Sequence, residues 1–183
     1  MKIYAARHGQ TEWNAVDRIC GITEVDLTEE GIAQAKELAE KAALNGDIDI
    51  IICSPMKRAR ETAAYVAKKI HKDIVIDERL IEWNYGSYEG KHRTAEGFPR
   101  AKAEFGCKMP DGGESLLQLA HRVYSAIDDA IEKYPDKNVL FVCHGGVCRV
   151  IETYFHDMTT DEFLHFFMGN CELREYIVPP FNC

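Results

Sequence analysis

The sequence predicts an α/β domain built on a mostly parallel β-sheet. Short apolar runs typical of buried strands alternate along the 183 residues with longer stretches in which apolar residues recur at helical spacing. Strands and helices that alternate in this way are joined by right-handed crossovers, which place the helices over the faces of the sheet. A chain of this length also buries enough apolar surface to form one core without a disulfide or a metal.

Five segments are expected to form strands because they are short, apolar and bounded by charged or turn-forming residues. The strongest are residues 2–6 (KIYAA), 47–54 (DIDIIICS) and 138–146 (NVLFVCHGG). Residues 73–78 (DIVIDE) are a weaker candidate, and residues 173–178 (LREYIV) are expected to lie at the edge of the sheet.

Three longer stretches carry apolar residues at helical spacing and are expected to form helices. The first covers 28–46, where Thr28 is placed to cap the start and a glycine follows the end. The second covers 54–70 and opens at a Ser-Pro pair. The third covers 115–134 and stops before a proline.

Residues 84–114 are less periodic and contain several glycines and two prolines. We expect this stretch to be a helical excursion that forms a lid or wall over a site. No internal repeat, low-complexity tract or linker divides the chain. Residues 1–183 are therefore expected to form a single domain.

Composition restricts the partners. The formal net charge of −8 disfavours nucleic acid, whereas a small anion can still bind a local cluster of positive groups. The chain has no run of about 18 apolar residues and no visible export signal, so we expect a cytoplasmic protein without a membrane span. Seven scattered cysteines without a C-x-x-C pair are expected to be reduced thiols. No H-E-x-x-H motif or Cys/His cluster occurs, so no metal site is expected.

Two predicted strands end in similar motifs, RHG at 7–9 and HGG at 144–146. Open α/β sheets bind ligands beyond the carboxyl ends of their strands. A glycine after each histidine lets backbone N–H groups approach an anion, and the helix that follows the second motif offers its positive end. We therefore expect His8 and His144 to face one phosphate-sized pocket.

The segment SPMKRARETA at 54–63 follows another strand and ends at the same edge of the sheet. Its Arg58 lies early in the predicted helix. Because a guanidinium presents a planar fork to two phosphate oxygens, Arg58 and Arg7 are expected to clamp a phosphoryl group together. Lys57 and Arg60 are better explained as a solvated helix face.

Glu82 lies just beyond the weaker strand and is flanked by apolar and aromatic residues. A partly buried carboxyl group in such surroundings favours its neutral form and can donate a proton to a leaving alkoxide. Glu78 and Glu89 are alternatives for this task, although each is better explained as an exposed or structural acid.

These residues belong to a longer series of motifs that runs through nearly the whole chain. In order, the motifs are Arg7-His8-Gly9-Gln10-Thr11-Glu12-Trp13-Asn14, Arg18 and Gly21, Leu27-Thr28 with Gly31 and Gln34-Ala35, Ser54-Pro55 with Arg58-Ala59 and Thr62-Ala63, Glu82 with Gly86 and Glu89-Gly90, Gly112-Gly113-Glu114-Ser115, and His144-Gly145-Gly146. The series resembles the histidine phosphatase superfamily, in its phosphoglycerate-mutase-like branch. The resemblance implies a three-layer α/β/α fold, a small phosphate ester as partner, and no metal or other cofactor.

The resemblance also implies a role for each residue of the site. His8 would be the nucleophile that becomes phosphorylated, and Glu82 would give a proton to the departing alcohol and then activate water. Three further residues would hold the phosphoryl oxygens: Arg7, Arg58 and His144. The residues expected to line the substrate pocket are Gly9, Thr11, Asn14, Gly21 and Gly145.

Phosphatases and mutases of this family share one core. Mutases usually carry a longer insertion with paired arginines, whereas the basic residues of the short insertion in this chain stand apart, at Lys91, Arg93, Arg100 and Lys102. We therefore expect a phosphomonoester phosphatase that acts on a small organic phosphate, with phosphoglycerate mutase as the alternative. The sequence identifies neither the alcohol part of the substrate nor the oligomeric state.

Two other classes of function fit the sequence less well. The spacing from Cys143 to Arg149 fits the loop of a cysteine-dependent phosphatase, but it leaves the motifs at 7–14, 54–63 and Glu82 without a purpose. Cys143 is better explained as a small buried residue. A non-catalytic phosphate-binding module is expected to lack at least one of the five principal site residues, and all five are present.

Overall fold

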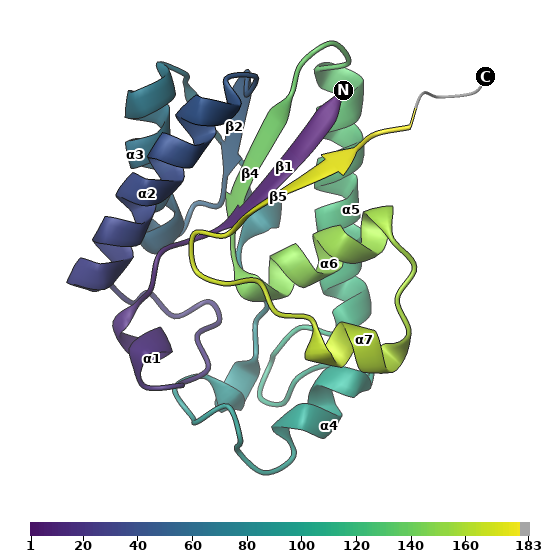
Figure 1. Ribbon diagram of the computed structural model, residues 1–183. Coiled ribbons are helices and arrows are strands. Elements are labelled where there is room, and N and C mark those ends of the chain that lie inside the picture. The colour runs from purple at the N-terminus through teal and green to yellow at the C-terminus, as the bar shows by residue number, and fades with distance from the viewer. Residues whose placement is uncertain (180–183) are drawn as a thin grey trace.

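The computed structural model describes residues 1–179 and consists of a β-sheet between two layers of helices (Figure 1). Within these residues the strands are β1 (Lys2–Arg7), β2 (Ile50–Cys53), β3 (Ile74–Ile76), β4 (Val139–Cys143) and β5 (Leu173–Ile177). The strand order is β3-β2-β4-β1-β5. The first four strands run parallel, and β5 pairs antiparallel with β1 at the edge. This is the three-layer fold with a mostly parallel sheet that was predicted.

Alternation along the strands builds a separate core on each face of the sheet. In β1, Ile3 and Ala5 point to the layer formed by α5 (Leu116–Lys133) and α6 (Gly145–Phe155). Tyr4 and Ala6 point to the opposite layer, formed by α2 (Glu29–Asn45) and α3 (Lys57–Ile70). Because both faces of the sheet are covered, its central strands are apolar along nearly their whole length.

Local capping determines where the main helices begin. The hydroxyl of Thr28 accepts a hydrogen bond from the third residue of α2 at 3.0 Å, and Ser115 forms a capping box at the start of α5. Both starts were predicted. The helix α3 begins later than expected, at Lys57, because Met56 is still extended and its N–H donates to the hydroxyl of Ser54 at 3.3 Å.

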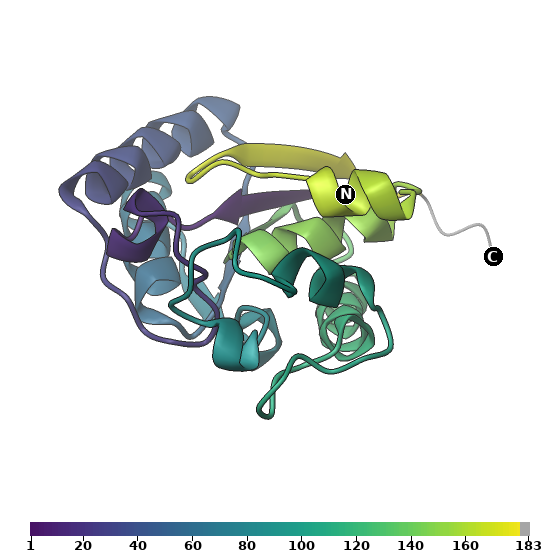
Figure 2. The ribbon, with the colours of Figure 1, turned by 90° about the horizontal axis from the view of Figure 1, so that it is seen from below.

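Residues 84–114 contain little regular structure beyond the 3₁₀ turn η2 (Gly86–Tyr88) and the short helix α4 (Phe98–Ala103); the turn η1 (Glu78–Leu80) precedes them. Together with α1 (Glu12–Ala15) and α7 (Thr160–His165), they lie at the carboxyl ends of the parallel strands (Figures 1 and 2). The two ends of this segment are held together, because the indole N–H of Trp83 donates to the carbonyl of Glu114 at 2.8 Å.

The register of the sheet places the two histidine motifs side by side. Arg7 at the end of β1 pairs with Cys143 at the end of β4, and the backbone N–H of His8 donates to the carbonyl of Cys143 at 3.0 Å. His8 and His144 therefore leave the sheet from neighbouring strands. The other five histidines are exposed: His71, His92, His121, His156 and His165. None of the helices in the described part of the chain is both long and apolar enough to span a bilayer.

Candidate active site

Two buried imidazoles form the centre of the site. The ring centroids of His8 and His144 are 5.1 Å apart and their planes meet at 61°. Both side chains are almost completely buried. The structure thus places the two rings side by side, as the paired motifs predicted, but of the two only His8 lines the pocket.

Hydrogen bonding fixes the tautomer of His8. Its Nδ1 lies 2.7 Å from the carbonyl oxygen of Gly9, so Nδ1 carries the proton and donates it. The other nitrogen, Nε2, then holds a lone pair, which accepts a hydrogen bond from Nε of Arg58 at 3.2 Å. A backbone carbonyl therefore orients the ring so that Nε2, and not Nδ1, carries the lone pair.

Burial also keeps both rings neutral. Desolvation lowers the pKa of His8 well below its usual value, and the nearby guanidinium groups of Arg58 and Arg7 lower it further. The pKa of His144 is lowered well below its usual value by the same causes. In the free protein both imidazoles are thus uncharged at neutral pH, and the neutral form is the one that can attack phosphorus.

We expect His8 and His144 to remain neutral at pH 5.5, about one unit below the ordinary histidine pKa of about 6.5. Because the unfolded chain binds these protons more readily, the free energy of unfolding should fall as the pH drops below about 6.5. The ¹⁵N chemical shifts of the ring nitrogens, recorded against pH, measure the charge state directly. Titration of both rings near their ordinary pKa would contradict this expectation.

Arg7 presents an unused donor beside the first turn of α6. Its side chain is buried, and Nη1 donates to the carbonyl of Met168 at 3.0 Å, but Nε has no partner. A Cβ atom built on Gly145 would lie 3.5 Å from this Nε, so the start of α6 and the guanidinium converge on one place. Backbone N–H groups at a helix start and an unpaired guanidinium N–H together favour the binding of an anion.

Arg58 is held differently. It is fully buried; Nη1 donates to the carbonyl of Thr23 at 2.9 Å, and Nη2 donates to that of Gly21 at 2.7 Å. Its Nε contacts His8, but the side chain is not part of the pocket surface. In the free protein Arg58 therefore fixes the loop at 21–23 and positions the ring of His8.

Glu82 is the carboxyl group that reaches the pocket. Its Oε1 accepts a hydrogen bond from the backbone of Trp83 at 2.8 Å, and its Oε2 accepts one from the backbone of Gly146 at 3.0 Å. The other two candidates lie elsewhere: Glu78 is exposed, and Glu89 accepts hydrogen bonds from the loop at 22–23. Of the three acids, only Glu82 lines the pocket that His8 lines.

Three of the residues expected to line the substrate pocket have other contacts. The N–H of Gly9 donates to Thr62 Oγ1 at 3.0 Å, and a Cβ atom at this position would lie 2.4 Å from the carbonyl of Gly31. Thr11 is buried and caps α1, and Gly21 offers its carbonyl to a guanidinium. None of the three is on the pocket surface, so each supports the site through packing or loop geometry.

Asn14 and Gly145 do line the pocket. Asn14 Oδ1 accepts from the backbone of Thr11 and from Nδ2 of Asn170, both at 3.3 Å. The same Nδ2 of Asn170 donates to the backbone carbonyl of His8 at 2.8 Å. Asn170 thus connects the loop before β5 to His8 and to Asn14. Nothing in the sequence pattern indicated this role.

The pocket encloses about 650 Å³, including the part open to solvent. Besides the residues above, its lining includes Ile19, Cys20, Tyr85, Arg93, Phe98, Lys102, Gly146, Arg149, Phe166, Phe167 and Met168. Sequence reasoning missed Ile19, Phe166, Phe167 and Met168 as site residues, and it considered Arg149 only for the cysteine-dependent mechanism. Arg149 lies four residues after Gly145 on α6, a spacing that places both on one helix face and could have revealed it.

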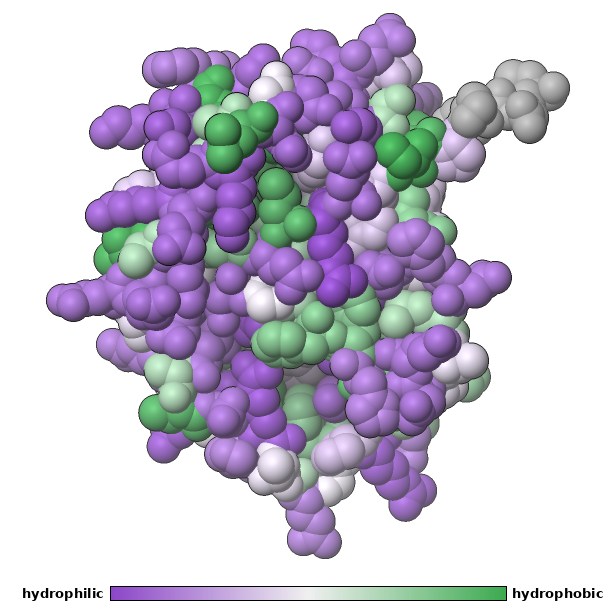
Figure 3. Space-filling model, viewed as in Figure 1, coloured by the Kyte–Doolittle hydropathy of each residue, from purple (hydrophilic) through white to green (hydrophobic). Residues whose placement is uncertain are grey.

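The surface around the site is mainly hydrophilic. Figure 3 shows a band of apolar atoms across the middle of this face, with a hollow beneath it. The loop that follows α7 contributes Phe166, Phe167 and Met168 to the pocket, and Arg7 lies 5.5 Å from the ring of Phe167. The position of this loop depends on tertiary packing, which explains why no periodicity in the sequence revealed it.

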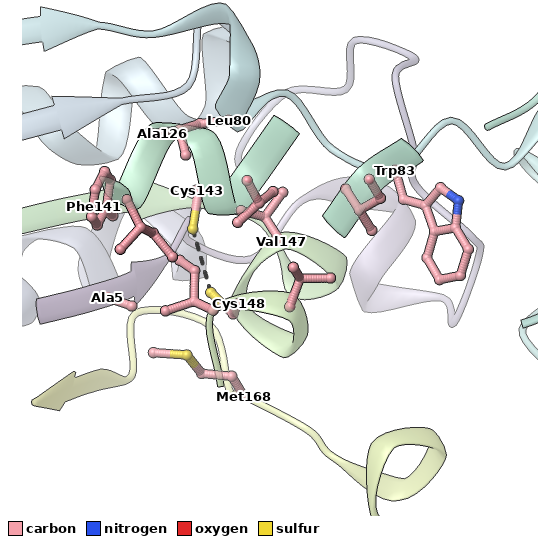
Figure 4. Close-up of a cluster of buried hydrophobic side chains, with 14 of the residues drawn as sticks. Ala5, Leu80, Trp83, Ala126, Phe141, Cys143, Val147, Cys148 and Met168 are labelled. Carbon is pink, nitrogen blue, oxygen red and sulfur yellow. Dashed lines mark hydrogen bonds between the residues drawn. The ribbon is translucent and has the colours of Figure 1, made fainter. Parts of the chain in front are cut away.

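The thiol of Cys143 lies in the hydrophobic core (Figure 4). It does not line the pocket. Its Sγ is 3.5 Å from Sγ of Cys148, and both side chains are fully buried. Burial raises the pKa of Cys143 well above its usual value, so a reactive thiolate is disfavoured. This geometry does not support a cysteine-dependent phosphatase. Cys183 lies outside the described residues.

Potential metal ligands do not gather near the site. Within residues 1–179, no three or more histidine, cysteine, aspartate or glutamate side chains lie close enough together to hold an ion. The donors that face the pocket are instead guanidinium, ammonium and backbone N–H groups, which suit an anion.

The fold and the site together define an α/β protein that presents an imidazole with an Nε2 lone pair and several guanidinium groups to one pocket. Residues 3–179 match the family model of the histidine phosphatase superfamily (branch 1). The chain therefore belongs to this superfamily, and the resemblance seen in its motifs is confirmed.

Named relatives include both phosphatases and mutases. The chain is 37% identical over 158 residues to a metal-independent phosphoserine phosphatase of Arabidopsis thaliana, in an alignment covering 82% of this chain and 66% of the relative. It is 34% identical over 154 residues to a probable phosphoglycerate mutase of Cronobacter sakazakii, covering 79% and 70%. The solved structure of a mycobacterial glucosyl-3-phosphoglycerate phosphatase superimposes with a TM-score of 0.82 at 26% identity, covering 95% of this chain and 88% of that chain.

Proposed function

We propose that the chain is a phosphoric monoester hydrolase in which His8 accepts the phosphoryl group of a small organic phosphate. Membership of the histidine phosphatase superfamily and the phosphatases among its relatives support this class of activity. The observation that carries the assignment to His8 is its Nε2 lone pair, fixed by the bond from Nδ1 to a backbone carbonyl and accompanied by a second imidazole.

The reaction has two steps. His8 Nε2 attacks phosphorus, and the bond from phosphorus to the alcohol oxygen breaks while protonated Glu82 gives its proton to that oxygen. The Glu82 carboxylate then takes a proton from water, whose oxygen attacks phosphorus. The bond from phosphorus to Nε2 breaks, and inorganic phosphate leaves.

The remaining groups stabilise the transferring phosphoryl. Its charge is spread over three equatorial oxygens, so catalysis depends mainly on donors already placed around them. Arg7 Nε and His144 Nδ1 are buried without partners in the free protein, and the start of α6 at Gly145 lies beside them. Arg58 Nε, which contacts the nucleophilic nitrogen, would turn to a phosphoryl oxygen once phosphorus is bound.

In this proposal, residues 84–114 form the wall of the pocket for the alcohol part of the substrate, within a single domain. Tyr85, Arg93, Phe98 and Lys102 of this segment face the pocket. They combine aromatic surface with positive charge, a lining that suits an organic body with polar substituents.

Hydrolysis and isomerisation can be separated in one assay. With 3-phosphoglycerate as substrate and a chelator present, we expect inorganic phosphate to accumulate and 2-phosphoglycerate to remain below a few per cent of it. Phosphate is measured colorimetrically and the two phosphoglycerates by ³¹P NMR. Interconversion that is faster than phosphate release would identify a mutase and overturn the proposal.

A further inference from the structure

The pocket holds more positive charge than one phosphoryl group accounts for. Four cationic side chains line it, Arg7, Arg93, Lys102 and Arg149, and only one carboxyl group, Glu82. The chain as a whole has a formal net charge of −8, so this concentration of cations is opposite to the overall charge. Arg7 belongs to the end of the pocket near His8. The other three come from residues 84–114 and from α6.

Three of these four cationic side chains have an Nε atom that lacks a partner. Within residues 1–179 the buried side-chain nitrogen and oxygen atoms without a hydrogen-bond partner are Arg7 Nε, Arg93 Nε, His144 Nδ1 and Arg149 Nε. Three of these atoms belong to arginines that line the pocket. The fourth belongs to His144, whose ring lies beside that of His8. A buried N–H without an acceptor costs free energy, so a cluster of them in one cavity indicates acceptors supplied by a ligand.

The protein positions these cations without neutralising them. Arg149 Cζ lies 5.3 Å from the ring centroid of Phe163, and its Nη2 donates to the carbonyl of Phe166 at 2.9 Å. Lys102 Nζ lies 4.9 Å from the ring centroid of Phe98. Aromatic faces and carbonyls hold a cation in place but leave its charge available to an anion.

Arg93 has no strong carboxylate partner either. Its Nε is 3.9 Å from the carboxylate of Asp17, whose side chain is 71% exposed, and this distance is too long for a hydrogen bond. Burial, with the charges of Arg149 and Arg93, lowers the pKa of Lys102 to about 8. The three cations therefore act on one another across the cavity, and an anion between them would relieve this repulsion.

We propose that Arg93, Lys102 and Arg149 bind a carboxylate on the alcohol part of the substrate, so that the preferred substrates are phosphorylated carboxylic acids. This inference rests on the proposed function, because it assumes that the phosphoryl group occupies the end of the pocket near His8. The two oxygens of a carboxylate match the planar fork of a guanidinium, and two guanidinium groups and one ammonium supply enough donors for both oxygens.

A matched pair of esters tests the inference. Phosphoserine and phosphoethanolamine share the phosphate, the amine and the two-carbon skeleton and differ only in the carboxylate. We expect kcat/KM for phosphoserine to exceed that for phosphoethanolamine by at least about 50-fold, since a site built to bind a charged group rejects an analogue that lacks it. In Arg93→Met, Lys102→Met and Arg149→Met, which keep an unbranched stem, this ratio should fall at least fivefold.

The control is Arg100→Met. Arg100 lies on α4 close to Lys102 in sequence, but its side chain is 86% exposed and pairs with Glu104. We expect the ratio to be unchanged in this variant. Comparing the two esters within each variant cancels any loss that misfolding causes, and the ratio of the native protein needs no variant at all.

The outcomes separate this inference from the proposed function. Equal hydrolysis of both esters by the native protein, or a ratio that all three substitutions leave unchanged, would overturn the carboxylate site and leave the phosphatase standing. Absence of phosphate release from these esters and from p-nitrophenyl phosphate would overturn both. A strong preference for phosphoserine that the three substitutions reduce and Arg100→Met does not would support the inference.

Discussion

Replacement of His8 by alanine is expected to lower kcat/KM for every phosphomonoester by at least about 10,000-fold, the scale on which enzymes lose activity with their nucleophile. The ring of this residue is fixed so that Nε2 carries the lone pair and reaches the pocket. The other imidazole cannot substitute, because His144 does not line the pocket and its Nε2 lies 2.7 Å from the hydroxyl of Ser54. Steady-state phosphate release measures the loss. Rapid quenching with ³²P-labelled ester should yield an acid-labile, alkali-stable adduct in the native protein and none in His8→Ala.

Two control variants make this result specific. Cys143→Ser should keep activity within about threefold, with a loss of stability of about 1–2 kcal/mol for burying a hydroxyl in the core. His121→Ala removes an exposed histidine of α5 and should have no effect. If Cys143→Ser were inactive and His8→Ala active, the phosphohistidine mechanism would be wrong and the cysteine mechanism would replace it.

Replacement of Glu82 by glutamine is expected to lower kcat/KM for an alkyl phosphate by about 100-fold to 10,000-fold, the usual contribution of general acid catalysis. The loss for p-nitrophenyl phosphate should be far smaller, because nitrophenolate leaves without needing a proton. Measuring both esters with native protein and variant yields a ratio that depends on proton donation. The same loss for both esters would show that Glu82 does not act as the acid.

A structural effect of this substitution has to be separated from the chemical one. Both carboxylate oxygens of Glu82 accept backbone N–H groups, from Trp83 and Gly146, and an amide can accept only one of these with its oxygen. Some loss of thermal stability is therefore expected. Glu78→Gln, which changes an exposed residue of the turn η1, is the matched control and should change neither the ratio of the two esters nor the melting temperature.

The features that the sequence predicted well depend on local chemistry. The starts of α2 and α5 follow from hydroxyl caps at Thr28 and Ser115, which act within three residues. The neighbouring positions of His8 and His144 follow from the rule that parallel strands present their carboxyl ends at one edge of the sheet. Such features need no knowledge of distant contacts.

The features that were missed depend on tertiary contacts. Gly9 was expected to face the ligand, but its small size is required by the backbone of α2, which passes against it. Phe166 to Met168 reach the pocket only because α7 and the chain after it fold back over the strand ends. Arg58 was expected to clamp phosphate. In the free protein, however, two of its nitrogens donate hydrogen bonds to backbone carbonyls of the loop at 21–23, which no sequence pattern indicated.

In the proposed function, the contacts that hold the two ends of residues 84–114 together separate substrate selectivity from phosphoryl transfer. Trp83 and Glu114 join the two ends of this segment, and Arg122 of α5 donates to both carboxylate oxygens of Glu114 and to the carbonyl of Ile81. Lengthening a segment whose ends are already fixed costs little, about 0.6 kcal/mol for each doubling. The tip can therefore be exchanged for a graft of another length while the two imidazoles stay in place, which gives evolution and protein engineers a way to alter substrate choice without rebuilding the nucleophile.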